Sequence, residues 1–427
     1  MTLNLLNAMT ISRKLGLIAS CFLLPLLTLL YFVWHGIESQ IDFAEAERAG
    51  LAYHRPLNGL LRELLQAQNG AGDTTRLETA WQETEAADRQ LGARLAFTKE
   101  GLAARGRAGA DVLSLRAKYA EWKQQPKPEK LQELIAGVRT MITHLGDTSN
   151  LILDPDLDSY YLMDVQLLAL PQTQERLAKI RDLLAKPDAV ELAVAARLLK
   201  ESDLDRIKAD AETVLKEDGN FHGLRASLQQ SLPKAVAAYA AATEPLVKLL
   251  EESGRAGKLT KPPAEARATA DAAFTQAFAL WDEAARELDG MLGTRTATFA
   301  RQRLLSLGLS FAALAMALLV VWVVARSIVR PMDECCGALE ALAAKDLTCH
   351  LNAVGDTELA RIAHAIDRAR ENFAEAVGQI REQAARLGET STEQLGSARD
   401  LAGQAGHASE QTRRMGEVAA ATKMNFT

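Results

Sequence analysis

The chain has 427 residues, a net charge of −6 and no basic cluster of the kind that binds nucleic acid. It is rich in helix-forming residues and only 5% aromatic, so helices are expected throughout and an all-α fold is predicted. Its four cysteines leave residues 36–303 without any, so that region must be held by packing and not by disulfides.

Residues 15–34 form an uncharged apolar run of about 20 residues, long enough to cross a bilayer as a helix. The run is longer than the apolar core of a cleavable signal peptide and does not end in small residues. Arg13 and Lys14 precede it, whereas Glu38 and Asp42 follow it, which places the N-terminus inside. A second run at 304–325 has arginines on both sides. We therefore predict cytoplasmic residues 1–14, spans at 15–34 and 304–325, and an outer domain at 36–303.

The outer domain is punctuated by glycine and proline. Between these breaks lie stretches of helical character of roughly 25–40 residues, and no strand-like alternation is visible. Six or seven such helices exceed one four-helix bundle, so we expect two bundle modules stacked end to end that share the long terminal helices. The expected breaks are at residues 69–72, 101–109, 126–128, 154–155, 186–187, 218–220 and 261–263.

Arg48, Arg55 and Arg62 are seven residues apart and form one stripe on a helix. Such a stripe could bind a carboxylate ligand, with Arg55 the best single candidate. The opposite helix face is apolar, however, which favours a stripe that faces water or a dimer partner. That apolar face consists of Leu57, Leu60, Leu61 and Leu64.

Asp154, Asp156 and Asp158 alternate as calcium ligands do, but the glycine and glutamate that an EF-hand loop requires next are missing. An aspartate followed by Pro155 is also the expected start of a helix, with Asp154 as the N-cap. We therefore predict a helix start and no cation site.

Tyr160 and Tyr161 follow directly. We expect them to be core aromatic residues, with contact to a ligand as the alternative.

A heptad pattern begins at Pro331, is interrupted at 345–357, and resumes to residue 373. Two short parallel segments cannot bury their apolar seams alone, so they imply the four-helix coiled coil of a homodimer. The predicted core residues are Met332, Cys335, Leu339, Leu342, Leu359, Ile362, Ile366 and Phe373.

Residues 326–380 resemble a HAMP domain, a relay module of membrane receptors. The resemblance rests on Arg330-Pro331, on Asp346-Leu347 and on the stretch 355–359, Gly-Asp-Thr-Glu-Leu. The sequence departs from the family pattern at Lys345, where glycine is usual, and also at Thr357 and Ala360.

Residues 381–427 continue as a polar-rich coiled coil similar to the start of the cytoplasmic rod of methyl-accepting chemotaxis proteins. Glu393-Gln394 resembles a methylation site, and a solvated helix face is the blander alternative. In the outer domain, stretches 50–57 and 154–164 resemble helical sensor domains of proteobacterial chemoreceptors. The resemblance implies a dimer in the bacterial inner membrane that binds a small periplasmic molecule. The hairpin tip that contacts the chemotaxis kinase and coupling protein is not within these 427 residues, so those partners are expected only if a tip is present.

No catalytic motif is apparent: the sequence lacks a phosphorylatable kinase helix, a GGDEF motif and a glycine-rich phosphate loop. Cys335, Cys336, Cys349 and His350 fit no standard zinc spacing. We expect no enzyme activity, no metal and no cofactor. The alternatives to a chemoreceptor are the sensory half of a histidine kinase or diguanylate cyclase without its catalytic domain, and a non-signalling membrane scaffold.

Overall fold

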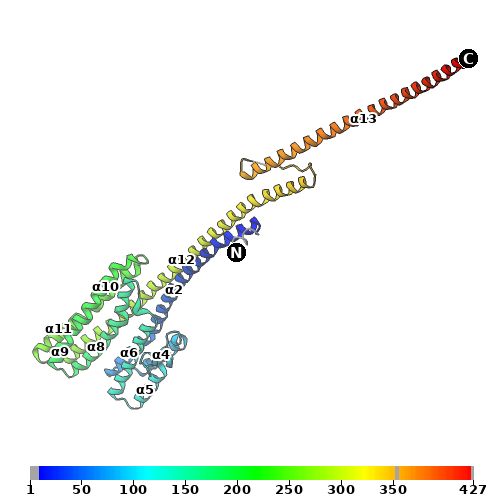
Figure 1. Cartoon of the computed structure of the whole chain (residues 1–427). Coiled ribbons are helices and arrows are strands. Elements are labelled where there is room, and N and C mark those ends of the chain that lie inside the picture. The colour runs from blue at the N-terminus through cyan, green and yellow to red at the C-terminus, as the bar shows by residue number, and fades with distance from the viewer. Residues whose placement is uncertain (1–8, 352–354, 425–427) are drawn as a thin grey trace. The chain divides into compact units, whose positions relative to one another are not determined.

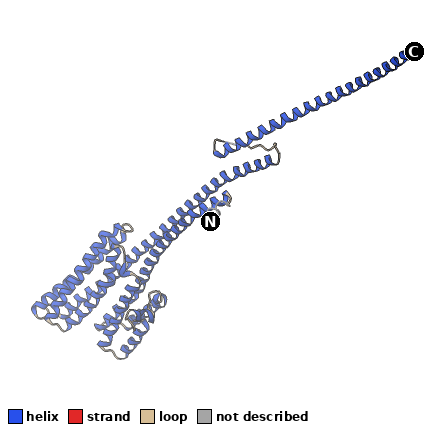
Figure 2. Ribbon diagram, in the orientation of Figure 1, coloured by secondary structure: helices blue, strands red, loops and turns tan. Residues whose placement is uncertain are grey.

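A computed structural model describes residues 9–351 and 355–424, and every regular element in that part of the chain is a helix (Figure 2), which confirms the all-α prediction. Parts of the predicted 1–14, 326–380 and 381–427 segments lie outside the described residues. The α-helices are α2 (Ile11–Gln68), α3 (Thr74–Ala87), α4 (Lys99–Ala104), α5 (Val112–Gln124), α6 (Pro128–Thr148), α7 (Leu157–Met163), α8 (Leu170–Ala185), α9 (Ala189–Arg197), α10 (Asp205–Glu217), α11 (Ala226–Ala256), α12 (Pro263–Ala343) and α13 (Glu358–Met424). The π-helical turns are η1 (Asp88–Gly92), η3 (Asp164–Ala169) and η4 (Leu198–Leu204), and the 3₁₀ turns are η2 (Leu151–Leu153) and η5 (Asp218–Asn220).

Six of the seven predicted breaks separate successive α-helices to within one residue, whereas the first half of the break at 101–109 is part of α4. Three of the helices that follow a break begin at an aspartate whose carboxylate accepts backbone N–H groups of the first turn, as helix N-caps do. These caps are Asp73 for α3, Asp111 for α5 and Asp188 for α9. The helices are shorter than predicted, since a further break at Ala96, whose φ is +55°, separates η1 from α4.

The chain divides into two compact units, residues 27–311 and residues 1–26 with 312–427. In the first unit, α3–α6 and α8–α11 form two helix groups (Figure 1). The α2 helix contacts the first group at Tyr53, whose hydroxyl donates to Asp88 at 2.8 Å. The α12 helix contacts the second group at Glu287, which accepts from Ser227 at 2.9 Å.

These contacts lie at the same level of the α2–α12 pair, because Arg55 of α2 donates to the Ala285 carbonyl of α12 at 3.2 Å. The two groups therefore lie beside each other and not end to end as the sequence suggested. Long helices that pack along their length offer both of their outer sides to further helices, so one shared core replaces two stacked ones.

That core is apolar around a few buried polar groups. The predicted apolar face of α2 is fully buried, as expected. At its centre Trp281 Nε1 donates to the Gln166 carbonyl at 2.8 Å, and Gln166 Nε2 lies 2.7 Å from His54 Nδ1. Burial lowers the pKa of His54 to about 3, so this imidazole is neutral. The three residues join α2, η3 and α12 at one point.

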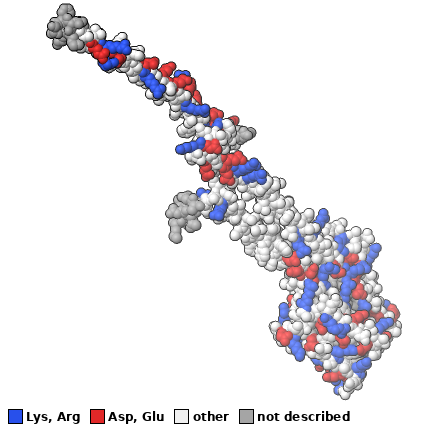
Figure 3. Space-filling view, turned by 90° about the vertical axis from the view of Figure 1, so that its right-hand side faces the viewer, with Lys and Arg blue, Asp and Glu red and all other residues white. Residues whose placement is uncertain are grey.

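Both α2 and α12 contain an 18-residue apolar window, with mean hydropathy of 2.2 and 2.5 and no buried residue in either. Figure 3 shows the corresponding uncharged band of surface. By length and composition these helices are able to cross a bilayer, which fits the spans predicted from the sequence.

Gly50 allows a close approach between α2 and the segment that follows α6. A Cβ placed on Gly50 would lie 2.3 Å from the Ser149 side chain and 3.0 Å from Leu151, too close for any side chain. Gly59, nine residues further along α2, has no atom within 4 Å of such a Cβ.

Gly50→Ala should therefore destabilise the domain by about 1–3 kcal/mol, the usual cost of overpacking. Gly59→Ala is the matched control and should be neutral or stabilising by up to about 1 kcal/mol, because alanine favours helix. Thermal melting of the detergent-solubilised chain, followed by far-UV circular dichroism, measures both. Equal melting temperatures for the two variants would contradict the close approach.

Candidate functional site

The most buried arginine of the first unit (the outer unit, residues 27–311) is Arg295 on α12. Its Nη1 donates to Glu47 Oε2 of α2 at 2.9 Å, and its Nη2 donates to Asp154 Oδ1 at 2.6 Å. Its Nε lies 2.7 Å from Asp156 Oδ2. Arg295, Glu47 and Asp154 are all buried. One guanidinium is thus surrounded by three carboxylates from two separate segments.

The segment that carries two of these carboxylates does not start a helix where the sequence predicted. The α7 helix begins at Leu157, with Asp156 and not Asp154 at the N-cap position. Asp154 Oδ1 instead accepts from the Asp156 N–H at 3.0 Å, from the Ser159 hydroxyl at 2.9 Å and from Arg295. A buried guanidinium left without carboxylates would be strongly destabilising, which outweighs a helix cap at the surface.

His222, in the loop before α11, completes the cluster. Its Nε2 lies 2.9 Å from Asp156 Oδ2, and its ring packs edge-to-face on Phe299 of α12 with centroids 5.8 Å apart. The Arg295 cluster, defined as Arg295, Glu47, Asp154, Asp156 and His222, therefore joins α2, α12 and the loops that precede α7 and α11.

Negative charge exceeds positive charge in this cluster. With the nearby buried Asp158 there are four carboxyl groups and one guanidinium, a formal charge of −3 if all are ionised. Burial first, and then the charge of Asp154, raises the pKa of Glu47 to about 8 in spite of Arg295. Burial likewise raises the pKa of Asp158 to about 6. Glu47 therefore holds a proton at neutral pH.

The geometry agrees with a protonated Glu47. Its Oε1 is buried and has no hydrogen-bond partner in the part of the chain that the structure describes. An ionised carboxylate would cost more to bury at such a place than a neutral carboxyl group, although a proton on Oε1 would also lack an acceptor.

The position of the cluster along the chain gives it a mechanical role. Glu47 follows the end of the first apolar run by 13 residues, or about 20 Å of helix. Arg303 of α12 also pairs with Glu38 of α2, between the cluster and that run. Ion pairs therefore fix the register of α2 against α12 on the stretch that leads to both apolar windows.

The predicted arginine stripe lies at the exposed side of the same helix pair. Arg48 donates to Asp289 at 3.1 Å, and Arg62 donates to Asp282 at 3.3 Å and lies over the Phe278 ring. Together with the bond from Arg55 to α12, these contacts show that each arginine has a partner within the chain. The sequence reading of a stripe facing only water or a second subunit was therefore incomplete, because the neighbouring helix was not foreseen.

Tyr160 and Tyr161 differ from each other. Tyr160 is 39% exposed, so its prediction as a core residue was wrong, whereas Tyr161 packs partly buried against the core. The helix α7 begins two residues later than predicted, which changes the face on which each ring lies. Neither tyrosine belongs to the Arg295 cluster.

The aspartates considered as calcium ligands face a guanidinium, which already supplies the positive charge that a cation would bring. Among the described residues, no group of three or more histidine, cysteine or acidic side chains is arranged to hold a metal ion. Cys335 is buried, as its predicted core position requires, while Cys336 and Cys349 are exposed.

The second unit contains the end of α12, a connector and α13. The α12 helix ends at Ala343, and Lys345 follows with a φ of +69°, the left-handed conformation that favours glycine after a helix. This left-handed conformation explains why the family pattern has glycine at the position of Lys345. The Asp346 N–H donates to the Ala341 carbonyl of α12 at 2.9 Å, and Arg370 of α13 donates to the Leu347 carbonyl at 3.1 Å, so the connector is tied to both helices.

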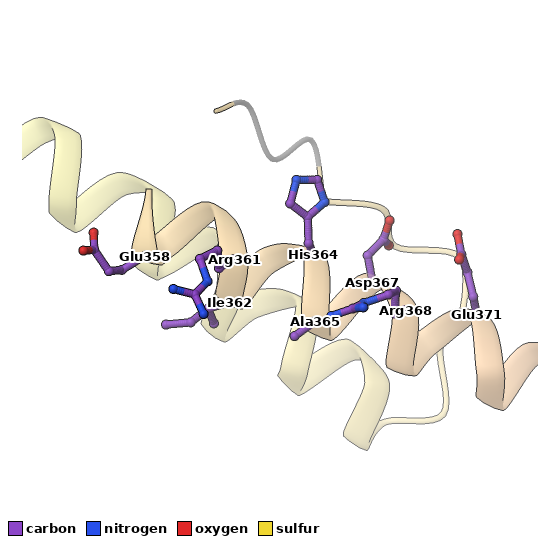
Figure 4. Close-up of a pocket in the computed structure, with 8 residues that line it drawn as sticks. All are labelled: Glu358, Arg361, Ile362, His364, Ala365, Asp367, Arg368 and Glu371. Atoms are coloured by element: carbon purple, nitrogen blue, oxygen red, sulfur yellow. The ribbon is translucent and has the colours of Figure 1, made fainter. Parts of the chain in front are cut away.

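Most of the predicted heptad core is not covered within one chain. Ile362 is 49% and Phe373 57% exposed, and Met332 and Leu339 are exposed as well. Leu342, Leu359 and Ile366 are half-buried. Figure 4 shows a hollow along α13 in which Ile362 and Ala365 lie on one side of the helix and His364 on the other. An apolar seam of this length and exposure is typical of a helix that packs against another copy.

Beyond the hollow, α13 continues without a break to Met424. Leu387, Glu393 and Gln394 are exposed on it. Their role in a coiled coil or as a methylation site stays a prediction.

Residues 323–375 match the family model of the HAMP domain. This stretch is a HAMP domain. It covers the end of α12, the connector and the start of α13, close to the range 326–380 inferred from sequence motifs. Searches among curated proteins and among solved structures found no match to the chain.

Sequence reasoning missed Glu47, His222 and Arg295 as site residues. Two of them carry a recognisable signal, because they occupy apolar positions of their helices. Glu47 lies between the buried Ala44 and Leu51, and Arg295 continues the buried series Leu288 and Leu292 in steps of four and three. A charged residue at a core position predicts a buried ion pair, but only the fold shows which partners it meets.

The pKa of Glu47 predicts a pH dependence. A carboxyl group whose pKa is higher in the folded than in the unfolded state stabilises the fold below about pH 4.5, and this contribution is lost as the pH rises to about 8. Glu47→Gln cannot ionise, so its stability relative to wild type should increase by at least about 1–2 kcal/mol between about pH 5 and pH 8.5.

Glu45→Gln, an exposed neighbour on the same helix, is the control and should follow wild type at every pH. Thermal melting of the solubilised chain across this pH range gives the comparison. Parallel curves for Glu47→Gln and wild type would show that Glu47 is ionised in the folded protein at all these pH values.

Proposed function

We propose that this protein is a dimeric, chemoreceptor-like transmembrane sensor. Its helical domain at 36–303 binds a small molecule outside the cytoplasm, the spans at 15–34 and 304–325 cross the bacterial inner membrane, and the HAMP domain relays the signal to the cytoplasmic helix. The HAMP domain after a helical region flanked by two long apolar helices supports this assignment. The resemblance of stretches 50–57 and 154–164 to chemoreceptor sensor domains supports a sensor more strongly than it supports chemotaxis, because similar domains also precede other output modules.

One observation carries the proposal. The α12 helix runs unbroken from Pro263 to Ala343 and holds Arg295, an apolar window and the first helix of the HAMP domain. A continuous helix passes on a displacement or rotation, because bending it would break backbone hydrogen bonds. The ligand would shift α12 against α2, and the HAMP domain would convert this shift between coiled-coil states.

The topology can be tested by labelling. A cysteine introduced as Lys200→Cys should react with a membrane-impermeant maleimide in intact spheroplasts, because residue 200 belongs to the outer domain in this proposal. The exposed native Cys336 and Cys349 serve as the internal control and should react only after lysis. Labelling of residue 200 only after lysis would overturn the proposed arrangement.

The dimer can be tested with a matched pair on α13, in a chain whose native cysteines are replaced by serine. Ile362→Cys should form an intermolecular disulfide under mild oxidation in membranes, since the exposed seam needs a second copy to bury it. His364→Cys lies on the opposite side of the helix and should cross-link much less (Figure 4). Equal cross-linking of both variants would indicate random collision and not a HAMP dimer.

A further inference from the structure

The outer unit contains a pocket at the end of α2 that is remote from the apolar runs. It lies between the end of α2, the start of α3 and the end of α5, and its volume is about 270 Å³. Residue 67 of α2 lies in its wall, 33 residues or about 50 Å of helix beyond the first apolar run. A pocket of this size admits a small organic molecule but not a peptide side chain with its backbone.

Three side chains from α5 give the pocket its chemistry. Tyr119, Trp122 and Lys123 are three and four residues apart, so they lie on one face of the helix. Leu77 of α3 is buried opposite them. The lining thus offers two aromatic rings, an apolar wall and one ammonium group.

The hydroxyl of Tyr119 is unused. The residue is 2% exposed, and its oxygen has no hydrogen-bond partner within residues 9–351 and 355–424. A buried hydroxyl without a partner costs free energy unless water or a ligand supplies one. Arg116 lies over the Tyr119 ring and is already paired with Glu78 and Glu85.

Lys123 is the cation of the pocket lining. Asp73, the acidic residue of the lining, caps α3 by accepting from the N–H groups of Thr75 and Arg76, and the Arg76 guanidinium 3.7 Å away offsets its charge. Lys123 is 54% exposed, and the Glu78 carboxylate near it is 3.9 Å away and already bonded to Arg116. The ammonium group of Lys123 is therefore available to an anionic ligand.

We propose that this pocket binds a small aromatic carboxylate. The ring packs on Trp122 and Leu77 and the carboxylate faces Lys123, whereas the Tyr119 hydroxyl stays buried behind the lining. The arginine stripe does not compete for this role, because its three side chains already bond to α12. The inference rests on the proposed sensor function and names its ligand class. Since the pocket contains the end of α2 but no part of α12, a ligand there acts on one helix of the pair.

The test uses benzoate as the probe and the full chain in detergent micelles, with isothermal titration calorimetry. Benzoate should bind the wild type, and benzylamine, which has the same ring with the opposite charge, should not. Lys123→Ala should weaken benzoate binding about 5- to 20-fold, as expected for loss of a partly exposed charge-assisted hydrogen bond. Lys118→Ala, an exposed lysine on the same helix, should leave the affinity unchanged.

Tyr119→Phe removes a hydroxyl that the pocket does not expose, so it should bind benzoate as the wild type does. No binding of benzoate to a wild-type protein that melts cooperatively would overturn the proposal. So would equal binding by wild type and Lys123→Ala, because the probe would then bind elsewhere.

The two proposals fail separately. If benzoate binds as expected but does not change the rate of Ile362→Cys cross-linking in membranes, the pocket stands and the relay to the HAMP domain is wrong. If the labelling and cross-linking results hold but benzoate does not bind, the receptor architecture stands and the ligand class is wrong.

Discussion

The outer unit depends on how one buried guanidinium is neutralised. Arg295 is buried, so the aspartates before α7 must stay beside it as counter-ions, and Glu47 of α2 accepts one of its hydrogen bonds. Breaking such a buried pair by removing one partner typically costs about 3–5 kcal/mol, far more than a surface ion pair contributes. An apolar contact would tolerate a sliding of α2 along α12, whereas this cluster has one register in which its hydrogen bonds form.

Because carboxyl groups are in excess, the net charge of the same cluster can change with pH. Glu47 keeps a proton at neutral pH because burial and Asp154 oppose its ionisation more strongly than Arg295 favours it. A single proton therefore changes the charge between the two long helices. In the proposed sensor, a contact of this kind would hold one register of α2 against α12 and still respond to a change of one charge.

The HAMP domain differs from the Arg295 cluster, because its predicted core is apolar and largely exposed in a single chain. Its helices leave Ile362, Phe373, Met332 and Leu339 exposed in a single chain, as is typical of helices that pack against a second copy. Lys345 adopts a left-handed conformation where the family uses glycine, which adds strain of roughly 1 kcal/mol at the turn after α12. Because the packing of such a coiled coil changes between discrete states, modest strain at the connector is enough to bias the choice among them.

The helical class, six of the seven breaks, the two apolar runs, the apolar face of α2 and the HAMP domain could all be predicted from the amino-acid sequence. These features are local: glycine, proline and aspartate set helix ends, and the spacing of apolar residues sets the buried face. Only the tertiary structure decided that the helix groups lie side by side, that the arginine stripe bonds to α12, and that Glu47, Asp154, Asp156 and Arg295 meet. The four residues are up to 248 positions apart, and no local pattern encodes which of several charged residues at core positions will be neighbours. The start of α7 was mispredicted for the same reason, since Arg295, which donates a hydrogen bond to Asp154, lies 141 residues further along the chain.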